Sequence, residues 1–219
     1  MKKGFTLAEV LITLAIIGVV AALTIPTVIA KYNQHAQYTA FMKMYNTITN
    51  VLSLVEGEEG KPNVWNYDYH VEAQVIQFLK SHIYSHFKIS KICESSTADC
   101  FSPYEIKGLN GSEMGSSDEV FMGNGLTVIL DDGSFLMVVP IEHDAVIFLF
   151  DTNGTKGPNL IGRDIFELMY ISDGNGKWGF DFSDNSHLST SYCDPNSSSG
   201  AGEGGGCAAK LLQEGKMNY

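Results

Sequence analysis

The chain has few basic residues. Its 219 residues contain 14 Lys and Arg but 25 Asp and Glu, which gives a formal net charge of −11 at pH 7. Beyond two lysines at the amino terminus, the basic residues are scattered, as Lys80, Lys88 and Lys91 illustrate. Because binding to nucleic acid depends on neutralising phosphates with Lys and Arg, the sequence predicts no nucleic-acid partner. An acidic balance of this size fits a soluble head or one that binds cations.

The sequence also lacks a motif for catalysis. No serine stands in the G-x-S-x-G context of a nucleophile elbow. His82 and His86 are four residues apart on a predicted helix, but no third metal ligand is evident, so we interpret them as a solvated helix face. Trp65 and Trp178 are more typical of a core than of a glycan platform. We therefore predict that the protein is not an enzyme.

Positive charge is missing altogether from a long apolar segment near the amino terminus. No Lys or Arg occurs between Phe5 and Ala30, whereas one carboxylate, Glu9, stands at the start of the segment. A helix from Val10 to Ala30 would be about 30 Å long, which matches the hydrocarbon core of a membrane. A lone carboxylate costs about 2.5–3.5 kcal/mol at the centre of such a helix, so it normally has a partner. A backbone amine would supply the positive charge if the chain were cut just before Phe5, which suggests cleavage followed by self-assembly.

The same segment resembles a known processing signal. The sequence KGFTLAE at residues 3–9 is similar, in its charge, glycine, aromatic residue and acid, to the class III signal of type IV pilins and type II secretion pseudopilins. The resemblance implies that a prepilin peptidase removes residues 1–4 by cutting between Gly4 and Phe5, and then methylates Phe5. It makes Glu9 the fifth residue of the mature chain and aligns Pro26 with the proline that the family often carries late in this helix.

The resemblance also implies partners and a location. Besides the prepilin peptidase, the expected partners are homologous pilin-like subunits in a filament and an assembly platform in the inner membrane. Lys2 and Lys3 place the leader on the cytoplasmic side. We therefore expect a single-pass protein of the cytoplasmic (inner) membrane with its head outside, which then enters a periplasmic or extracellular filament.

Two filament types and a different functional class stay open. The signal is shared by type II secretion pseudopili and true type IV pili. The acidic head and a candidate calcium loop favour the pseudopilus, which we choose, whereas a disulfide near the carboxyl terminus favours the pilus. An ordinary secretory signal peptide has a shorter apolar stretch. The alternative from another class is a membrane-anchored extracytoplasmic domain that binds calcium or a glycan and never polymerises.

The helical pattern continues past the apolar segment. Apolar residues recur at three- and four-residue spacing from Tyr38 to Val55, between polar residues, which predicts an amphipathic helix. The alternative is two separate helices that break near Pro26, because proline removes a backbone donor and clashes within a helix. The predicted organisation is a leader (1–4), a transmembrane and assembly helix (5–30), its amphipathic continuation (31–56) and an extracytoplasmic head (57–219).

The head is predicted to complete an α+β, pilin-like fold. A second helix is expected over 71–92 and irregular structure over 93–124. Residues 194–206 are low in complexity and are predicted to be a flexible loop that packs no core. A small, mostly antiparallel sheet packed on the long N-terminal helix would bury both apolar faces. Short runs rich in Val, Ile and Phe predict its strands at 126–130, 135–139, 146–150 and 166–171.

The four cysteines indicate disulfides. They allow three connectivities, and their spacing favours Cys93–Cys100 and Cys193–Cys207. A crosslink that closes a loop of about 15 residues is worth about 3 kcal/mol in the chain-entropy model, and disulfides indicate an oxidising compartment. The resemblance likewise implies the crosslinked C-terminal loop of many pilins. The alternative, a zinc site with histidines, lacks the usual CxxC spacing.

One loop is dense in oxygen donors. Asp151, Asn153 and Thr155 alternate along the chain and could face one ion, with Asp164 closing the shell, because calcium takes six to eight oxygen ligands. The resemblance supports calcium as the one candidate cofactor, since major pseudopilins bind it in a C-terminal loop. The match to an EF-hand is poor. The alternative is a turn after a strand, in which Asp and Asn side chains bond to nearby backbone.

Overall fold

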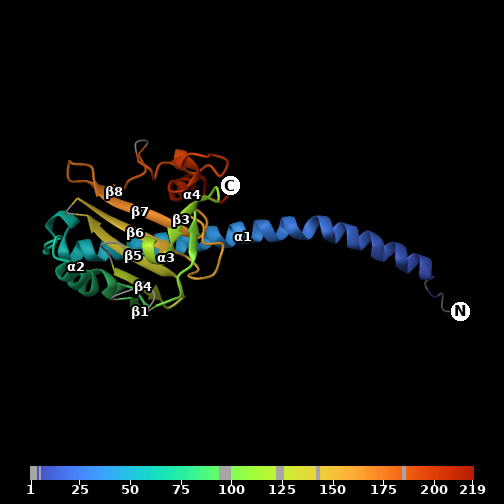
Figure 1. Cartoon of the computed structure of the whole chain (residues 1–219), viewed down its shortest axis with the longest axis horizontal. Coiled ribbons are helices and arrows are strands. Elements are labelled where there is room, and N and C mark those ends of the chain that lie inside the picture. The colour runs from blue at the N-terminus through green and yellow to red at the C-terminus, as the bar shows by residue number, and fades with distance from the viewer. Residues whose placement is uncertain (1–3, 5, 94–99, 122–125, 142–143, 184–185) are drawn as a thin grey trace.

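The computed structural model describes residues 4, 6–93, 100–121, 126–141, 144–183 and 186–219. It has a long N-terminal helix whose second half packs against an α+β head, while the first half extends away from the head (Figure 1). This is the predicted pilin-like fold class. The predicted cleavage and methylation site at Phe5 lies outside the described residues.

The helix α1 (Leu7–Glu59) is one continuous element of 53 residues, about 80 Å long at 1.5 Å per residue. Pro26 lies inside it, so the alternative of two separate helices is wrong. The helix ends at Glu59 rather than Glu56, where Gly60 adopts a φ of 80° that glycine tolerates best. The predicted amphipathic spacing is confirmed by its buried residues, which are Phe41, Met44, Ile48, Val51, Leu52 and Val55.

The second helix is shorter than predicted. A 3-10 turn (Pro62–Val64) leads to α2 (Glu72–Phe78), which continues as a π-helical turn (Leu79–Ile83) and a 3-10 turn (Tyr84–His86). The prediction of helix up to residue 92 is wrong, because the chain becomes extended at Phe87 and forms strand β1 (Ile89–Cys93). The apolar spacing of residues 71–92 is compatible with a helix. It does not show that a distant strand, β4 (Leu126–Leu130), pairs with residues 89–93.

The main sheet has six strands in the described part of the chain, in the order β1-β4-β5-β6-β7-β8, and every neighbouring pair is antiparallel. The four predicted strands are present, and the edge strands β1 and β8 were missed. A turn at Asp132-Gly133 joins β4 to β5, with Gly133 at a φ of 85°. The remaining five strands are β4 (Leu126–Leu130), β5 (Phe135–Ile141), β6 (Ala145–Asp151), β7 (Ile165–Ser172) and β8 (Trp178–Phe180).

Both faces of the sheet are covered. On one face α1 packs against residues such as Phe166, whose ring centroid lies 4.7 Å from that of Phe41. The other face is covered by a small hairpin, β2 (Glu105–Lys107) and β3 (Glu113–Ser116), with the short helix α3 (Ser117–Val120). Residues 93–124 were predicted to be irregular, which is wrong for β2, β3 and α3. Because strand side chains alternate between faces, a second core lies under this hairpin, built from Phe101, Ile106, Phe121, Phe135, Met137 and Ile165.

The Gly- and Ser-rich segment 194–206 contributes to the packing of the head, which corrects the prediction that it packs no core. The backbone N–H of Leu109 donates to the carbonyl of Glu203 (3.0 Å), and that of Asn110 to Gly202 (2.8 Å). Gly202 and Gly206 are buried, and a Cβ at either would overlap backbone atoms. Glycine is therefore needed here for close approach rather than for mobility, and the mobility of the loop stays a prediction. One 3-10 turn (Thr190–Tyr192) precedes the segment, another (Gly200–Gly202) lies within it, and α4 (Cys207–Glu214) follows it.

Candidate functional site

The carboxylate of Glu9 caps its own helix. The backbone N–H and the hydroxyl of Thr6 donate to Oε2 of Glu9 (2.7 and 2.8 Å), and the N–H of Glu9 donates to Oγ1 of Thr6 (3.3 Å). This reciprocal capping box satisfies free donors at the start of the helix. Oε1 of Glu9 makes no hydrogen bond to any described residue. One carboxylate oxygen therefore holds the helix end while the other is available to a group outside the chain.

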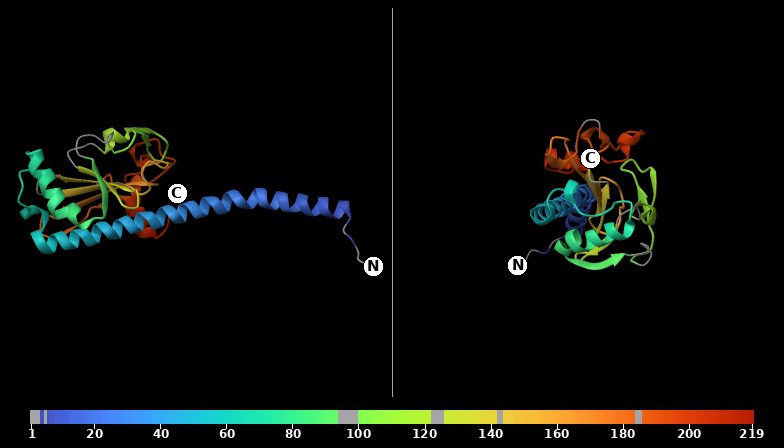
Figure 2. Two further views of the ribbon diagram at one scale, coloured as in Figure 1. Left: turned by 90° about the horizontal axis from the view of Figure 1, so that it is seen from below. Right: turned by 90° about the vertical axis from the view of Figure 1, so that its left-hand side faces the viewer.

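The first half of α1 has nothing covering it. The large apolar side chains between Leu7 and Ile29 are exposed all round the helix, and an 18-residue window with a mean hydropathy of 2.4 shows no burial. A helix that is apolar on every side is stable only in lipid or among other helices. Figure 2 shows this half projecting from the head as a gently curved rod. Its length and composition allow it to cross a membrane.

Pro26 lies within this uncovered half, as the sequence predicts. Proline has no N–H, so the carbonyl of Ala22 loses its helical donor. The hydroxyl of Thr24 bonds to the carbonyl of Val20 at 2.9 Å, one turn earlier. The helix remains continuous through this weak point.

These features define a class of protein. A long helix with an exposed apolar half and one acid at its start, joined to an α+β head, is a pilin-like arrangement. Residues 1–25 match the family model described as the prokaryotic N-terminal methylation motif, which is the prepilin-type signal of type IV pilins and pseudopilins. The motif supports a membrane-anchored, pilin-like or pseudopilin subunit that a prepilin peptidase processes. The chain matches no curated protein and no solved structure.

Both predicted disulfides are present. Cys93 and Cys100 have Cα atoms 5.7 Å apart, and those of Cys193 and Cys207 are 4.8 Å apart. The first bond joins β1 to the segment that leads into β2, and the second fastens α4 to the loop before it. No cysteine is left free for zinc.

The predicted calcium residues come together only in part. Asp151 and Asp164 are fully buried, and the side-chain amide of Asn153 donates to Oδ2 of Asp164 at 3.2 Å. Thr155 is exposed and makes no bond to the two carboxylates. The carboxylate of Asp151 accepts from the N–H groups of Asn153 (3.0 Å) and Gly154 (2.9 Å) and from the hydroxyl of Tyr104 (2.9 Å). Asp151 therefore forms the turn that the alternative interpretation describes.

Asp164 has a similar role, and two amide oxygens beside it have no partner. Its carboxylate accepts from the N–H groups of Leu160 (2.8 Å) and Asn159 (2.9 Å). The buried Oδ1 atoms of Asn153 and Asn159 make no hydrogen bond. Within the described ranges, no three His, Cys, Asp or Glu side chains form a metal-binding group. The sequence prediction did not include Tyr104, which lies 47 residues before Asp151. It also left Asn159 of the same loop out of the ion shell, because alternation along the chain did not place Asn159 there.

Burial dominates the electrostatics of this loop. Desolvation raises the pKa of Asp151 to about 7, against the opposing effect of the N–H of Asn153, and the neighbouring charge of Asp164 raises it further. Desolvation also raises the pKa of Asp164 and that of Tyr104, whose ionisation the charge of Asp151 further disfavours. Burial therefore disfavours the ionised form of both carboxyls, and the negative charge of Asp164 makes ionisation of Asp151 still less favourable.

The raised pKa of Asp151 predicts a pH dependence of stability. The pKa is about 7 in the folded chain and about 3.9 in an unfolded one, so the folded state binds the proton more tightly. The stabilisation is complete below pH 4 and is lost as the pH rises through 7. We expect the free energy of unfolding to fall by about 1 kcal/mol between pH 6 and pH 8, measured by denaturant titration. Asp151→Asn should remove this slope, and the exposed Asp131→Asn should keep it; an unchanged slope in Asp151→Asn contradicts the assignment.

The two histidines lie beside carboxylates at the end of α1. Nδ1 of His82 lies 2.8 Å from Oε1 of Glu59, and Nε2 of His86 lies 3.2 Å from Oε2 of Glu58. Both imidazoles are partly buried, so the prediction of a solvated face is only partly right. Trp65 and Trp178 are core residues, as predicted.

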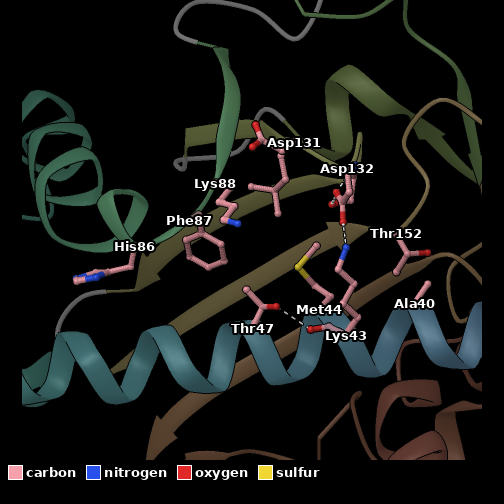
Figure 3. A pocket seen from close by; sticks show the side chains of 12 residues that line it. Ala40, Lys43, Met44, Thr47, His86, Phe87, Lys88, Asp131, Asp132 and Thr152 are labelled. Atoms are coloured by element: carbon pink, nitrogen blue, oxygen red, sulfur yellow. Dashed lines mark hydrogen bonds and ion pairs between the residues drawn. The ribbon is translucent and has the colours of Figure 1, made fainter.

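A groove of about 490 Å³ runs between α1 and the turn that joins β4 to β5 (Figure 3). Met44, Phe87 and Leu130 are buried residues that line it. At its rim the ammonium of Lys43 lies 2.5 Å from Oδ2 of Asp132. This ion pair neutralises the rim locally, so the groove presents no concentrated charge to a ligand.

Proposed function

We propose that the protein is a structural subunit of a type II secretion pseudopilus or a type IV pilus-like filament. In this proposal it is inserted in the inner membrane as a single-pass protein with its head outside, trimmed after Gly4, methylated on Phe5 and polymerised through α1. One observation carries the proposal. The exposed apolar half of α1 has no cover within the described chain, and its single acid, Glu9, has one carboxylate oxygen without a bond.

The physical reason for assembly is charge pairing in an apolar bundle. An unpaired charge in a low-dielectric environment is costly, and an opposite charge with good hydrogen bonds offsets much of that cost. No Lys or Arg follows Phe5 within the apolar segment. The amine of Phe5 created by cleavage in a neighbouring subunit supplies the missing charge. Oε1 of Glu9 is the atom that would accept its hydrogen bond, while Oε2 keeps the capping bonds to Thr6.

The deciding experiment is to sequence the amino terminus of the protein isolated from membranes. Methyl-phenylalanine from position 5, together with recovery of the protein in sheared, sedimented filaments, supports the proposal. An intact Met1 in protein that stays in the membrane fraction supports the non-polymerising anchored domain instead.

A second experiment, deletion of the gene, distinguishes a secretion pseudopilus from a type IV pilus. The candidate calcium loop favours a secretion pseudopilus and the C-terminal disulfide favours a pilus, and we keep the pseudopilus as the first choice. Deleting the gene is then expected to leave secreted proteins in the periplasm without removing surface fibres. Loss of surface fibres with normal secretion identifies a pilus.

Calcium binding at Asp151, Asn153, Thr155 and Asp164 is a second proposal. Two buried carboxyls with raised pKa values and two unpartnered amide oxygens favour a cation there. A ligand at 100 times its Kd stabilises a fold by about 2.7 kcal/mol. Millimolar calcium should therefore raise the Tm of the chelator-treated chain. Asp164→Asn should lose the effect and Asp131→Asn keep it, whereas an unchanged Tm in the unmodified chain assigns the loop to turn formation alone.

A further inference from the structure

The two edges of the main sheet lie on opposite sides of the head and differ in character (Figure 1). One edge is β8, with three residues. The other is β1, whose pairing with β4 is irregular between Ile89 and Lys91. Edge strands expose unpaired backbone groups that another chain can use. The free backbone groups, the side chains and the charges along each edge therefore indicate which partner strand can bind there.

The backbone of β8 has free hydrogen-bonding groups. The bonds from Asp173 to Lys177 and from Asp181 to Met169 fix which residues of β8 face β7. Because hydrogen-bonded and non-bonded pairs alternate in antiparallel strands, Gly179 bonds to β7, while the N–H and C=O groups of Trp178 and Phe180 point away from it. No described residue bonds to these outward groups.

The side chains of β8 leave room for another strand. Trp178 and Phe180 belong to the core on the α1 side of the sheet, so Gly179 faces the opposite side. A Cβ built on Gly179 meets no atom within 4 Å. A hollow of about 380 Å³ is lined by residues of β8 and the end of β7. An extended backbone can therefore approach this edge closely.

The β8 edge carries two acids and one lysine, whereas the β1 edge is basic. Asp181 follows β8, and Asp173 lies opposite Lys177 across the turn that precedes β8. The exposed Lys88 and Lys91 accompany β1. Exposed pairs of this kind contribute only about 0.2–1 kcal/mol each. Such charge pairs contribute little to the affinity, but they favour one register and one partner over others.

Strand direction decides which copies can pair. The sheet alternates throughout, so β1 and β8 run in opposite directions. β1 of one copy placed beside β8 of the next continues the antiparallel alternation without a twofold axis. Pairing β8 with β8 needs a twofold axis perpendicular to the sheet. That axis would point the two α1 helices in opposite directions, which one membrane does not permit.

We propose that β8 of one subunit pairs with β1 of its neighbour, so that the main sheet continues from head to head along the assembly. The inference rests on the proposed assembly of parallel subunits through α1. It adds a second contact, made by backbone bonds from Trp178 and Phe180 and oriented by the lysines of β1 and the aspartates of β8.

Cysteine crosslinking between two differently marked chains tests this contact. One full-length chain carries Ser90→Cys and the other Gly179→Cys. Both positions face away from α1, because Ile89, Ile92, Trp178 and Phe180 pack on the α1 side. The native cysteines are all in disulfides, so a short bifunctional maleimide reacts with the new ones. In sedimented filaments that contain both chains, we expect a heterodimer, and neither chain alone should form a dimer.

Several outcomes would contradict the pairing of β8 with β1 while leaving the proposed assembly into filaments intact. Filaments that contain both chains but yield no heterodimer exclude the pairing, as do equal yields when Ser112→Cys, in the β2–β3 turn, replaces Ser90→Cys. Dimers from Gly179→Cys alone indicate β8 self-pairing instead.

If the cysteine chains do not enter filaments, the chain that carries both Lys88→Glu and Lys91→Glu provides a second test. It should lower the sedimented filament several-fold while the exposed Lys216→Glu does not, and equal amounts contradict the pairing. Failure of the unmodified chain to sediment contradicts assembly itself.

Discussion

Gly4→Val is expected to leave nearly all of the protein as an unprocessed precursor. The proposed scissile bond follows Gly4, where a peptidase must bring its catalytic groups close to the backbone. An added isopropyl group in a site shaped for hydrogen costs about 1–3 kcal/mol or more by overpacking, which corresponds to a loss in rate of about fivefold to 140-fold or more at about 1.4 kcal/mol per tenfold. The precursor and mature forms are separated by mass spectrometry of the membrane fraction.

A matched glycine controls for the general effect of valine on this region. Gly18 lies inside α1, and a Cβ built on either glycine meets nothing within 4 Å. Gly18→Val should therefore be processed normally. A mature amino terminus at Phe5 in Gly4→Val would reject the assigned cleavage site.

Glu9→Val is expected to be cleaved and inserted normally but to enter filaments far less. In the mutant the amine of Phe5 of a neighbouring subunit is buried without its partner. Breaking a buried ion pair by removing one partner costs about 3–5 kcal/mol, and every 1.4 kcal/mol is about tenfold in an equilibrium constant. We expect a loss of about a hundredfold or more in the sedimented fraction, measured by quantitative blotting of sheared filaments against the membrane pool.

The capping box makes a sharper control possible. A glutamine at the third helical position can replace glutamate in such a cap, so Glu9→Gln preserves the bonds to Thr6 and removes only the charge. If pairing with the amine drives assembly, Glu9→Gln should fail nearly as badly as Glu9→Val, while Thr13→Val assembles normally. Wild-type assembly of Glu9→Gln would show that the cap, rather than the charge, is what filaments need.

Local patterns in the sequence were reliable where the interaction is local. The three- and four-residue spacing from Phe41 to Val55 predicted the buried stripe of α1, and short β-branched runs predicted the central strands. The cysteine spacing favoured the two pairs that form. Each of these depends on residues close together in the chain, or on a periodic face that any core will bury.

Predictions failed where a distant segment decided the outcome. Ile89 and Ile92 continue a helical spacing, yet they lie in β1, because β4 offers a backbone edge to pair with. Phe101, Ile106 and Phe121 had no visible periodicity, and they pack under a hairpin only because the second face of the sheet needs a cover. The glycines of 194–206 indicated mobility, but they permit close contact with backbone carbonyls.

The contacts within the candidate calcium loop likewise depend on how distant segments pack. Alternation along the chain placed Thr155 with Asp151 and Asn153, but the loop turns Thr155 outward and brings in Tyr104 and Asn159. Which oxygens face one another depends on how the loop closes against its neighbours, and sequence spacing does not contain that information.

The amino acids alone determined that this chain has a membrane-length helix with one acid, a processing motif before it and a head crosslinked by two disulfides. Charge, hydrophobicity and spacing act over a few residues and need no knowledge of the fold. Only the tertiary structure decided that one oxygen of Glu9 stays available while Thr6 holds the other. It also decided that Asp151 is buried beside Asp164, and that β8 ends the sheet with unpaired backbone groups. Each of these depends on which atoms meet after distant segments have packed.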